Sequence, residues 1–493
     1  MRLPAVGTLL FRCVRPSVLW ITPGGQTGSQ SGDRIVICRH PKRARLVPAA
    51  ALAALLLTVA ALVGGAPGGA AAQSRSIALI RDAEIEATLR DLAVPVFEAA
   101  GLSGESVRLY IVSDDGLNAF VAGGMNLFLN TGLIRRTEHA GQLLGVIAHE
   151  AGHISGGHLS RMPTAMRRAT AEAILAAVLG AAAAVAGAPD VGAAIMFGGQ
   201  HVAQQGLLKF SRTQEQAADQ AAVTYLARVG VSARGLLEFF KVLDNQSALT
   251  LSRSSPFIQT HPLTRERITF MENQVAAEPP GRPPAPPGSE AAFGRMIAKL
   301  DGFLGEPDRV LRDYANDGSL AGRYARAIAL YRIPDLDAAL REVAALSAEY
   351  PDDPYFHELQ GQILFENGRI REAVPAYRTA MRLSPGAALI RTALGQALLE
   401  SGDDPGATTE ALAHLKEAVR LEPENATAWR LLGIAHGRGD EQGLSALALA
   451  EHALLVGRKE DARLYARRAE ARVPPSDPAW LRVQDILRTL ETD

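Results

Sequence analysis

The residues with the clearest chemical potential are two histidines and a glutamate in the run His149-Glu150-Ala151-Gly152-His153, which has the pattern H-E-x-x-H. On a helix, residues four apart lie one above the other, so both imidazoles can bind one metal ion. Glu150 then stands beside the ion, where a carboxylate can act on a water molecule. A solvated polar helix end is the alternative reading, but the apolar run 143–148 before the motif favours a buried helix and a zinc site.

A second pair of chemical groups lies downstream, in Glu215 and Asp219. A catalytic zinc site needs three protein ligands and one open position, and Glu215 is the best candidate for the third ligand. Asp219 is one helical turn further on the same face, where it can accept a hydrogen bond from a ligand histidine and fix its tautomer. Taken alone, an acidic pair at this spacing is more often a solvated helix face, so the residues by themselves leave both interpretations open.

Three other histidines are not expected to bind the metal. If the helix that carries the motif runs over residues 138–160, His158 is about half a turn out of phase with His149. His201 lies near an apolar segment and is expected to be structural. His139 is expected on the surface.

The N-terminal region has the features of an export signal. Residues 39–45 are basic, residues 47–63 are apolar, and Ala70-Ala71-Ala72 is a small-residue site, so we expect a secretory signal cut after Ala72. A permanent membrane anchor is the alternative, and residues 1–35 before the signal suggest an over-called start codon. Cys13 and Cys38 both precede the cut, so the exported chain needs no disulfide and has no thiolate ligand.

Length and charge limit the class of protein. A chain of 493 residues is too long for one ordinary core, so two or more domains are expected. The net charge of −1 argues against a nucleic-acid binder. Removal of residues 1–72 leaves 43 Lys and Arg against 51 Asp and Glu, which predicts a mildly acidic exported protein.

The elements around the motif predict an α+β unit over residues 73–277. Residues 74–101 have helical periodicity, 107–112 alternate as a strand, and 118–129 form a second strand region interrupted by Gly123-Gly124. Residues 171–208 are mostly apolar with a break at 187–190, and each half is too short to span a bilayer. We expect a helical hairpin here, either buried or in contact with a membrane surface.

The second half of the chain predicts helical repeats. The proline-rich segment 278–290 is a semi-rigid linker and a domain boundary. Beyond it, in residues 291–493, Pro351 and Pro385 are 34 residues apart, as are Gly361 and Gly395. That period is typical of tetratricopeptide repeats, of which we count about four, and a non-repeating helical bundle is the alternative. Such a superhelix offers a concave surface for partner proteins.

The two ligand motifs together resemble a known family. His149-Glu150-x-x-His153 with Ser211-Arg212-x-x-Glu215-x-x-Ala218-Asp219 is similar to the gluzincin peptidases that include HtpX and the CAAX prenyl endopeptidase. Asn118-Ala119-Phe120 and Thr260-His261-Pro262 extend the resemblance, and the signal and repeats make the chain most similar to BepA-type periplasmic metalloproteases over residues 75–490. Ala217 stands where an acidic residue is commoner, which leaves the support of the ligands undefined.

The resemblance implies a role for each residue. It implies an α+β zinc metallopeptidase (gluzincin) domain followed by an all-α tetratricopeptide-repeat superhelix, with one Zn²⁺ per chain held by His149, His153 and Glu215 and with Asp219 supporting a ligand. Glu150 would take the proton of the attacking water and pass it to the leaving amine.

Three further assignments follow from the resemblance. His261 would be a fourth, displaceable ligand that holds the enzyme shut, or would stabilise an oxyanion; a helix-start residue before Pro262 is the alternative. Arg265 or Arg267 is a secondary candidate. The strand around Gly124, Met125 and Asn126 would pair with the main chain of a peptide, although an ordinary core strand fits the same pattern.

Two functions follow as hypotheses. The first is a periplasmic zinc endopeptidase that degrades unfolded or misassembled envelope and outer-membrane proteins. The second is a chaperone or assembly factor whose repeats bind a partner protein while proteolysis is latent. The intact metal motif favours the first hypothesis and the repeats favour the second. Segment 171–208 adds contact with a membrane surface if it is not buried.

Overall fold

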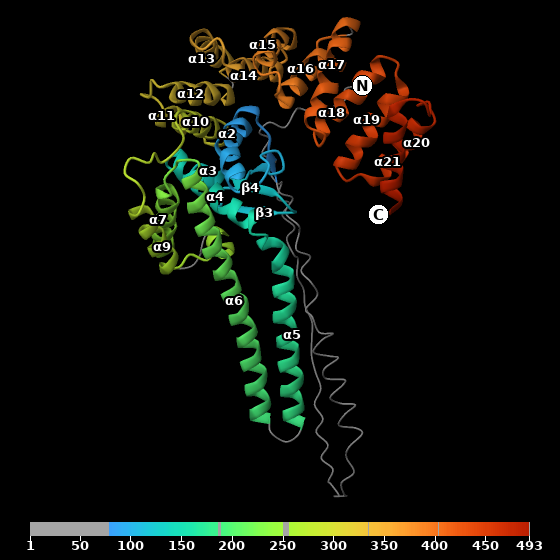
Figure 1. Ribbon diagram of the computed structural model, residues 1–493. Helices are drawn as coiled ribbons and strands as arrows, with labels where there is room; N and C mark the ends of the chain where they lie inside the picture. The colour runs from blue at the N-terminus through green and yellow to red at the C-terminus, as the bar shows by residue number, and fades with distance from the viewer. Residues whose placement is uncertain (1–77, 186–188, 250–255, 334, 403, 493) are drawn as a thin grey trace, which may run out of the picture. The chain divides into compact units, whose positions relative to one another are not determined.

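The computed structural model describes residues 78–185, 189–249, 256–333, 335–402 and 404–492 (Figure 1). The expected signal sequence and both cysteines lie outside the described residues. The described chain begins with strands and helices and continues with helices alone. The elements before residue 277 are β1 (Leu79–Ile80), α2 (Ala83–Ala99), β2 (Arg108–Val112), β3 (Ala119–Ala122), β4 (Asn126–Asn130), α3 (Thr131–Ile134), α4 (Ala140–Ser155), α5 (His158–Val185), α6 (Pro189–Arg228), α7 (Arg234–Leu249), α8 (Pro256–Thr260) and α9 (Arg265–Ala276).

The remaining elements are helices. They are α10 (Ser289–Leu304), α11 (Pro307–Asp313), α12 (Leu320–Arg332), α13 (Leu336–Glu349), α14 (Pro354–Glu366), α15 (Ile370–Leu383), α16 (Ala388–Glu400), α17 (Pro405–Leu421), α18 (Ala426–Arg438), α19 (Gln442–Leu455), α20 (Lys459–Glu470) and α21 (Pro478–Thr492).

The first helix is shorter than its periodicity predicts. Leu79 and Ile80 pair with β2 as a strand. The helix starts only at Ala83, because Oδ1 of Asp82 accepts hydrogen bonds from the backbone N–H groups of Glu84 and Ile85. The predicted helix over residues 74–101 was therefore wrong at residues 78–82, where Leu79 and Ile80 form a strand, and residues 74–77 lie outside the described residues.

Four strands form one sheet in the order β1-β2-β4-β3. β2 and β4 are parallel, whereas β1 and β3 are antiparallel to their neighbours. Gly123 and Gly124 make the turn between β3 and β4 at φ of 58° and 100°, a backbone conformation that glycine adopts readily. Because β4 lies between β2 and β3, the free edge on this side of the sheet is β3.

Helix α4 is the centre of the apolar core around the sheet. Every residue from Ala140 to His153 is buried, and the helix packs against α2, α6 and α7. The expected helix 138–160 is wrong beyond Ser155, because Gly157 takes a φ of +61° and ends the run. His158 instead begins a separate helix, α5.

Helices α5 and α6 lie side by side as a long hairpin (Figure 1). The hairpin is as expected, but the version of the prediction in which it is buried is wrong for the described residues. Ile174, Leu175 and Phe197 are 59%, 60% and 69% exposed. Among the described helices, none is both long enough and apolar enough to span a bilayer.

Helix pairs from α12 onward confirm the predicted repeats. A glycine in the first helix of a pair lies against a large side chain of the second, where a Cβ would come within 2.9 Å of the Tyr377 ring at Gly361 and 2.7 Å of Leu415 at Gly395. Gly433 repeats the contact against Leu449. The spacing of these glycines, 34 residues from Gly361 to Gly395 and 38 from Gly395 to Gly433, thus reflects one close helix–helix contact per repeat.

Helix α10 packs into the same apolar core as α4, through Phe293, Met296 and Leu300. Beside this core, Nζ of Lys299 is buried 2.8 Å from Oδ2 of Asp82. The boundary at 278–290 remains a prediction.

Candidate metal centre

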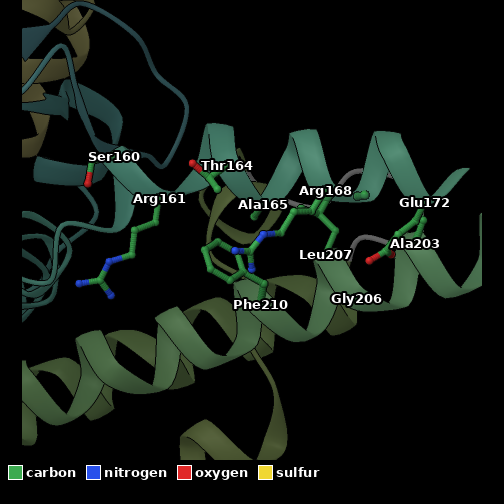
Figure 2. Close-up of a pocket in the computed structure, with 11 residues that line it drawn as sticks. Ser160, Arg161, Thr164, Ala165, Arg168, Glu172, Ala203, Gly206, Leu207 and Phe210 are labelled. Atoms are coloured by element: carbon green, nitrogen blue, oxygen red, sulfur yellow. The ribbon is translucent and has the colours of Figure 1, made fainter. Parts of the chain in front are cut away.

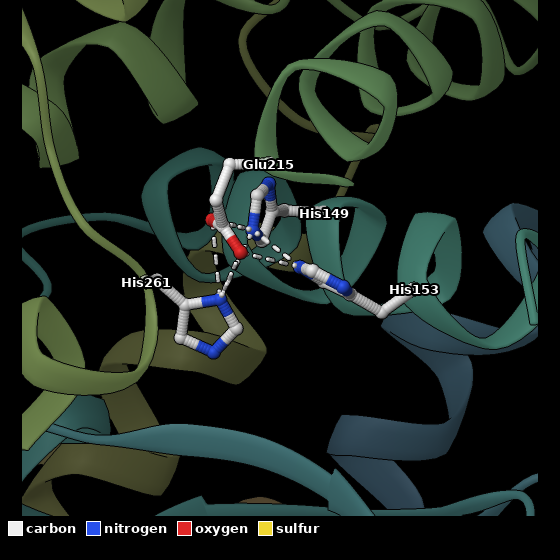
Figure 3. Close-up of side chains that lie close together, drawn as sticks. All are labelled: His149, His153, Glu215 and His261. Atoms are coloured by element: carbon white, nitrogen blue, oxygen red, sulfur yellow. Dashed lines mark hydrogen bonds and ion pairs between the residues drawn. The ribbon is translucent and has the colours of Figure 1, made fainter. Parts of the chain in front are cut away.

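Four donor side chains converge between α4, α6 and the residue that follows α8 (Figure 3). Nε2 of His149 lies 3.1 Å from Nε2 of His153 and 3.3 Å from Oε2 of Glu215. Oε1 of Glu215 lies 3.3 Å from Nε2 of His153 and 3.3 Å from Nδ1 of His261. Their ligand atoms all lie within 4.8 Å of one another.

The donor set fits a zinc ion in chemistry and in spacing. Zinc prefers imidazole and carboxylate donors at about 2.0–2.2 Å in a tetrahedral arrangement, which sets neighbouring donors about 3.3 Å apart. The four residues are buried, with exposed fractions of 0% for His149, 8% for His153, 3% for Glu215 and 6% for His261. Removing three imidazoles and one carboxylate from water costs free energy, and coordination of a metal ion would offset that cost.

Helices α4 and α6 approach closely enough to bring Glu215 to the two histidines of the motif because Gly152 has no side chain. A Cβ on Gly152 would lie 2.9 Å from the carbonyl oxygen and 3.0 Å from Cα of Ala218, which stands between Glu215 and Asp219 on α6. The glycine within the motif therefore sets the distance between the ligands of α4 and those of α6.

Asp219 supports His149 from behind. Oδ1 of Asp219 lies 2.9 Å from Nδ1 of His149, the ring nitrogen that points away from the cluster. A carboxylate at this position holds a ligand imidazole in one tautomer and orientation. Burial opposes a charge on His149, but Asp219 and Glu215 outweigh it and raise the pKa of His149 to about 9 when no metal ion is bound.

Arg267 connects the carboxylates of the site. Its guanidinium donates two hydrogen bonds to Asp219, at 2.7 and 2.8 Å, and its Nη1 lies 3.0 Å from Oε2 of Glu215. Nη1 also donates to the carbonyl oxygen of Pro262, next to His261. Burial works against ionisation of Asp219, yet Arg267 and then His149 hold the pKa of Asp219 below its ordinary value.

His158 supports the second ligand histidine. Its Nδ1 lies 2.9 Å from Nδ1 of His153, again on the side away from the cluster. Burial, followed by the nearby His153, lowers the pKa of His158 to about 4, so the ring is neutral and can accept the N–H of His153. His158 is not among the four donors, as expected, but its supporting contact with His153 was not predicted, because one continuous helix was assumed.

Glu150 lies beside the donors as a buried carboxylate. Its exposed fraction is 0%, and neither of its oxygens accepts a hydrogen bond within the described part of the chain. The nearest ring nitrogen is Nε2 of His261, at 3.5 Å from Oε1. A pocket of about 300 Å³ opens here, with Glu150 and the edge-strand residues Phe120 and Val121 in its wall.

His261 is held by α8. Its backbone N–H donates to the carbonyl oxygen of Phe257 at 2.7 Å, and the two rings stack with centroids 4.6 Å apart. The backbone N–H of Phe257 in turn donates to the carbonyl oxygen of Leu117, which precedes β3. His261 thus reaches the donor cluster from a short helix anchored to the edge strand.

The other predicted residues lie elsewhere. Asn126 is paired with Arg108 and Ala122 on its two sides, and Gly124 and Met125 belong to the turn, so this segment does not offer a free strand edge. The prediction that it does was wrong, because strand order is not visible in a single sequence. Arg265 and His201 are exposed and outside the cluster.

His139 precedes α4, and its ring lies 2.7 Å from Oε2 of Glu238. It is half-buried rather than fully on the surface.

Similarity to known proteins agrees with this architecture. Residues 79–275 match peptidase family M48, and residues 324–388, 358–410 and 406–443 match a tetratricopeptide repeat. The beta-barrel assembly-enhancing protease of Yersinia pestis is 27% identical over 374 residues, which cover 74% of this chain and 75% of the relative. The protein of the same name from Escherichia coli K12 is 24% identical and covers 78% of this chain and 79% of its own.

The metalloprotease YcaL of Escherichia coli K12 is 25% identical over 172 residues, which cover 34% of this chain and 62% of the relative. The predicted family resemblance and fold class are confirmed. The chain therefore carries a metallopeptidase domain of peptidase family M48, followed by tetratricopeptide repeats.

Proposed function

We propose that this chain is an exported zinc endopeptidase that acts in the periplasm on unfolded or misassembled outer-membrane proteins. The observation that carries the proposal is the buried carboxylate of Glu150, which accepts no hydrogen bond in the described part of the chain, beside three donors of the kind that zinc prefers. His149, His153 and Glu215 would hold the ion. When bound, zinc polarises a carbonyl oxygen and acidifies a water molecule.

Glu150 is placed to move the proton. Its carboxylate accepts a proton from the attacking water and then donates it to the nitrogen of the leaving amine. Asp219 would keep His149 oriented through its contact with Nδ1, and Arg267 would hold Asp219 and Glu215 in place. In this scheme one proton moves from the water through Glu150 to the leaving amine, while the side chains that would hold the zinc ion stay in place.

The substrate would bind along β3 as an added strand. β3 is the free edge, and its Phe120 and Val121 line the same pocket as Glu150. Main-chain hydrogen bonds to an edge strand accept many sequences, as a quality-control peptidase requires. The proposed substrate strand is therefore Ala119–Ala122 instead of the segment with Gly124, Met125 and Asn126.

His261 would act as a displaceable fourth ligand. A catalytic zinc site keeps one position open, whereas four protein donors close it. The geometry of His261 within 3.3–3.4 Å of the neighbouring donor atoms supports a closed resting state, from which His261 must withdraw before a peptide binds. The same residue is then free to stabilise the oxyanion of the reaction.

The names of the relatives support the choice of substrate. The two relatives that the chain matches over three quarters or more of their length are named beta-barrel assembly-enhancing proteases, and the repeats of this chain fit a docking role on an envelope partner protein. The second candidate function, a chaperone or assembly factor with latent proteolysis, is supported by the closed donor set together with the repeats.

A Glu150→Gln variant tests the proposal. We expect cleavage of an unfolded outer-membrane protein to be lost while zinc content, measured by atomic absorption, stays at one per chain. Glu98→Gln, a change of an exposed carboxylate on α2, is the matched control and should cleave normally. Unchanged cleavage by Glu150→Gln would exclude Glu150 as the base, and rescue of outer-membrane assembly by this variant would establish the chaperone function on its own.

Two more variants separate the ligand roles. Glu215→Ala should lose most of the zinc, because it removes one of three core donors. His261→Ala should keep its zinc and cleave faster than the natural protein. A loss of zinc or of all activity in His261→Ala would contradict the displaceable-ligand role.

A further inference from the structure

The hairpin of α5 and α6 packs with its small residues inside. A Cβ on Gly199 would lie 2.0 Å from Cβ of Ala176, and one on Gly180 would lie 2.5 Å from the carbonyl oxygen of Gly192. In a water-exposed pair of helices, the large apolar side chains normally fill the seam and the small residues face outward. Glycine and alanine in the seam are instead typical of helices packed in lipid, where large apolar residues face the acyl chains.

The outer faces of the hairpin carry the large apolar side chains. Val178 and Leu179 on α5 are 60% and 51% exposed, and Phe197 and Val202 on α6 are 69% and 63% exposed. Exposed apolar surface of this extent is costly in water and marks an interaction site.

Charge is absent from the apolar part of the hairpin and positive at its base. No residue between Glu172 and Asp190, and none between Asp190 and Lys209, carries a formal charge. Towards the base, exposed cations lie on both helices, and none of them has an ion-pair partner among the described residues: Arg161, Arg167, Arg168 and Lys209. A basic collar below an apolar region matches the headgroup and acyl layers of an anionic membrane.

A pocket of about 420 Å³ lies between the two helices at this collar (Figure 2). Arg161, Arg168 and Thr164 line it, and Leu207 and Phe210 form an apolar wall. Glu172 also lines it, at the end towards the apolar region. Guanidinium and hydroxyl groups are the usual donors to a phosphate group, and the apolar wall suits the start of an acyl chain.

We propose that the α5/α6 hairpin lies in the surface of an anionic phospholipid membrane, with a lipid phosphate in the pocket of Arg161 and Arg168. The uncharged stretch of α5 from Ala173 to Val185 is about 20 Å long, shorter than the roughly 30 Å of bilayer hydrocarbon. Asp190 near the tip is costly to place in hydrocarbon, so the hairpin lies in the headgroup boundary and does not cross it. The inference does not depend on peptidase activity.

Cosedimentation of the full exported chain with lipid vesicles tests the proposal. We expect binding to vesicles of phosphatidylglycerol and phosphatidylcholine, weaker binding to phosphatidylcholine alone, and partial release by high salt. Ile174→Gln/Val178→Gln should lower the partition coefficient about tenfold or more, because two exposed aliphatic contacts are lost. Arg161→Gln/Arg168→Gln should lower it about fivefold for each cation, on anionic vesicles only.

Matched variants elsewhere control for general effects. Leu464→Gln/Leu481→Gln removes two exposed leucines of the repeats, and Arg90→Gln/Arg341→Gln removes two exposed cations outside the hairpin. Both should bind vesicles like the natural protein. Equal losses in the control variants, or no binding to any vesicle, would overturn the proposal and leave the hairpin as a surface for a protein partner.

Inorganic phosphate at matched ionic strength distinguishes the two sources of a phosphate group. It should release no more protein than chloride does, because a lipid phosphate is held together with its acyl chains. Inorganic phosphate could instead lower the vesicle-bound fraction of the natural protein as much as Arg161→Gln/Arg168→Gln does. In that case the pocket binds free phosphate and the lipid assignment is wrong.

Discussion

The closest contact between the two ligand-bearing helices can be tested by changing Gly152 to alanine. Gly152 lies on α4 between His149 and His153, with the backbone of Ala218 of α6 against it. Helix propensity alone predicts that a buried Gly→Ala change stabilises a helix by about 0.5–1 kcal/mol. The structure predicts the opposite sign.

The magnitude follows from the distances. The new Cβ would lie 2.9 Å from the carbonyl oxygen of Ala218 and 3.2 Å from Cβ of Ala221, closer than ordinary contact by about 0.5 Å for the oxygen. The neighbouring atoms are backbone and a short side chain, so α6 must move as a unit. Overpacking of this kind costs about 1–3 kcal/mol, which exceeds the gain in propensity.

The shift also carries Glu215 away from the histidines. We expect metal affinity to fall about tenfold, since displaced supporting groups typically cost 10–100-fold. The assays are competition with a fluorescent zinc chelator and thermal unfolding of the metal-free protein. Gly294→Ala on α10 is the matched control, because a Cβ there would meet no atom within 4 Å and should stabilise the chain.

If Gly152→Ala binds zinc as tightly as the natural protein and gains stability like Gly294→Ala, then the α4–α6 contact does not set the ligand geometry. A loss of stability without loss of metal affinity would mean that α6 tilts about the site instead of moving away from it, and would equally refute the proposed coupling.

Two further changes probe supporting residues. Asp219→Asn should lower zinc affinity about 10–100-fold with little change in the fold of the repeats, because the neutral amide no longer fixes His149 and presents a donor towards Arg267; isothermal titration measures this. Burial raises the pKa of Glu358 to about 8, so its contribution to stability is fully present below its ordinary pKa and is lost as the pH rises through about 8. Glu358→Gln should therefore raise the unfolding temperature relative to the natural protein near pH 9 but not near pH 5, and a gain of equal size at both values would show that this carboxyl does not titrate as described.

The local part of the metal site could be predicted from the sequence. His149 and His153 are four residues apart on one helix, so their proximity follows from helix geometry alone. Glu215 lies on another element, and its place in the cluster depends on how α6 packs on α4. Spacing within the sequence carries no information on that packing, which is why the interpretation of Glu215 rested on a family resemblance.

The supporting contacts of Arg267 and His158 were not predicted, because they too depend on how separate helices pack. Arg267 reaches Asp219 across 48 positions of sequence. The argument that His158 does not bind the metal assumed one continuous helix, although Gly156-Gly157 was the available signal for a break. Two adjacent glycines after a helical run are a common C-terminal signature, and they would have placed His158 on a new helix.

The hairpin illustrates a different limit. An apolar, alanine-rich helix has the same composition whether it is buried in a protein core or faces lipid. What distinguishes the two is which residues lie in the seam between the helices, as for Gly180 and Gly199, and this is a property of packing. The edge strand was mislocated on similar grounds, because strand order depends on pairings that a single sequence does not reveal.

The four donors of the metal centre differ in how easily they can leave it. Glu215 can withdraw only if α6 slides along α4 across the close contact at Gly152, and the two motif histidines are fixed by the buried helix α4. His261 follows α8, a helix of 5 residues; its ring stacks on that of Phe257, and its backbone N–H donates to the carbonyl oxygen of Phe257. The backbone N–H of Phe257 is hydrogen-bonded to the carbonyl oxygen of Leu117, two residues before β3. A peptide that pairs with β3 would therefore disturb the support of His261 more directly than that of the other donors. The same binding event that delivers the peptide to Glu150 is thus the one placed to open the fourth position.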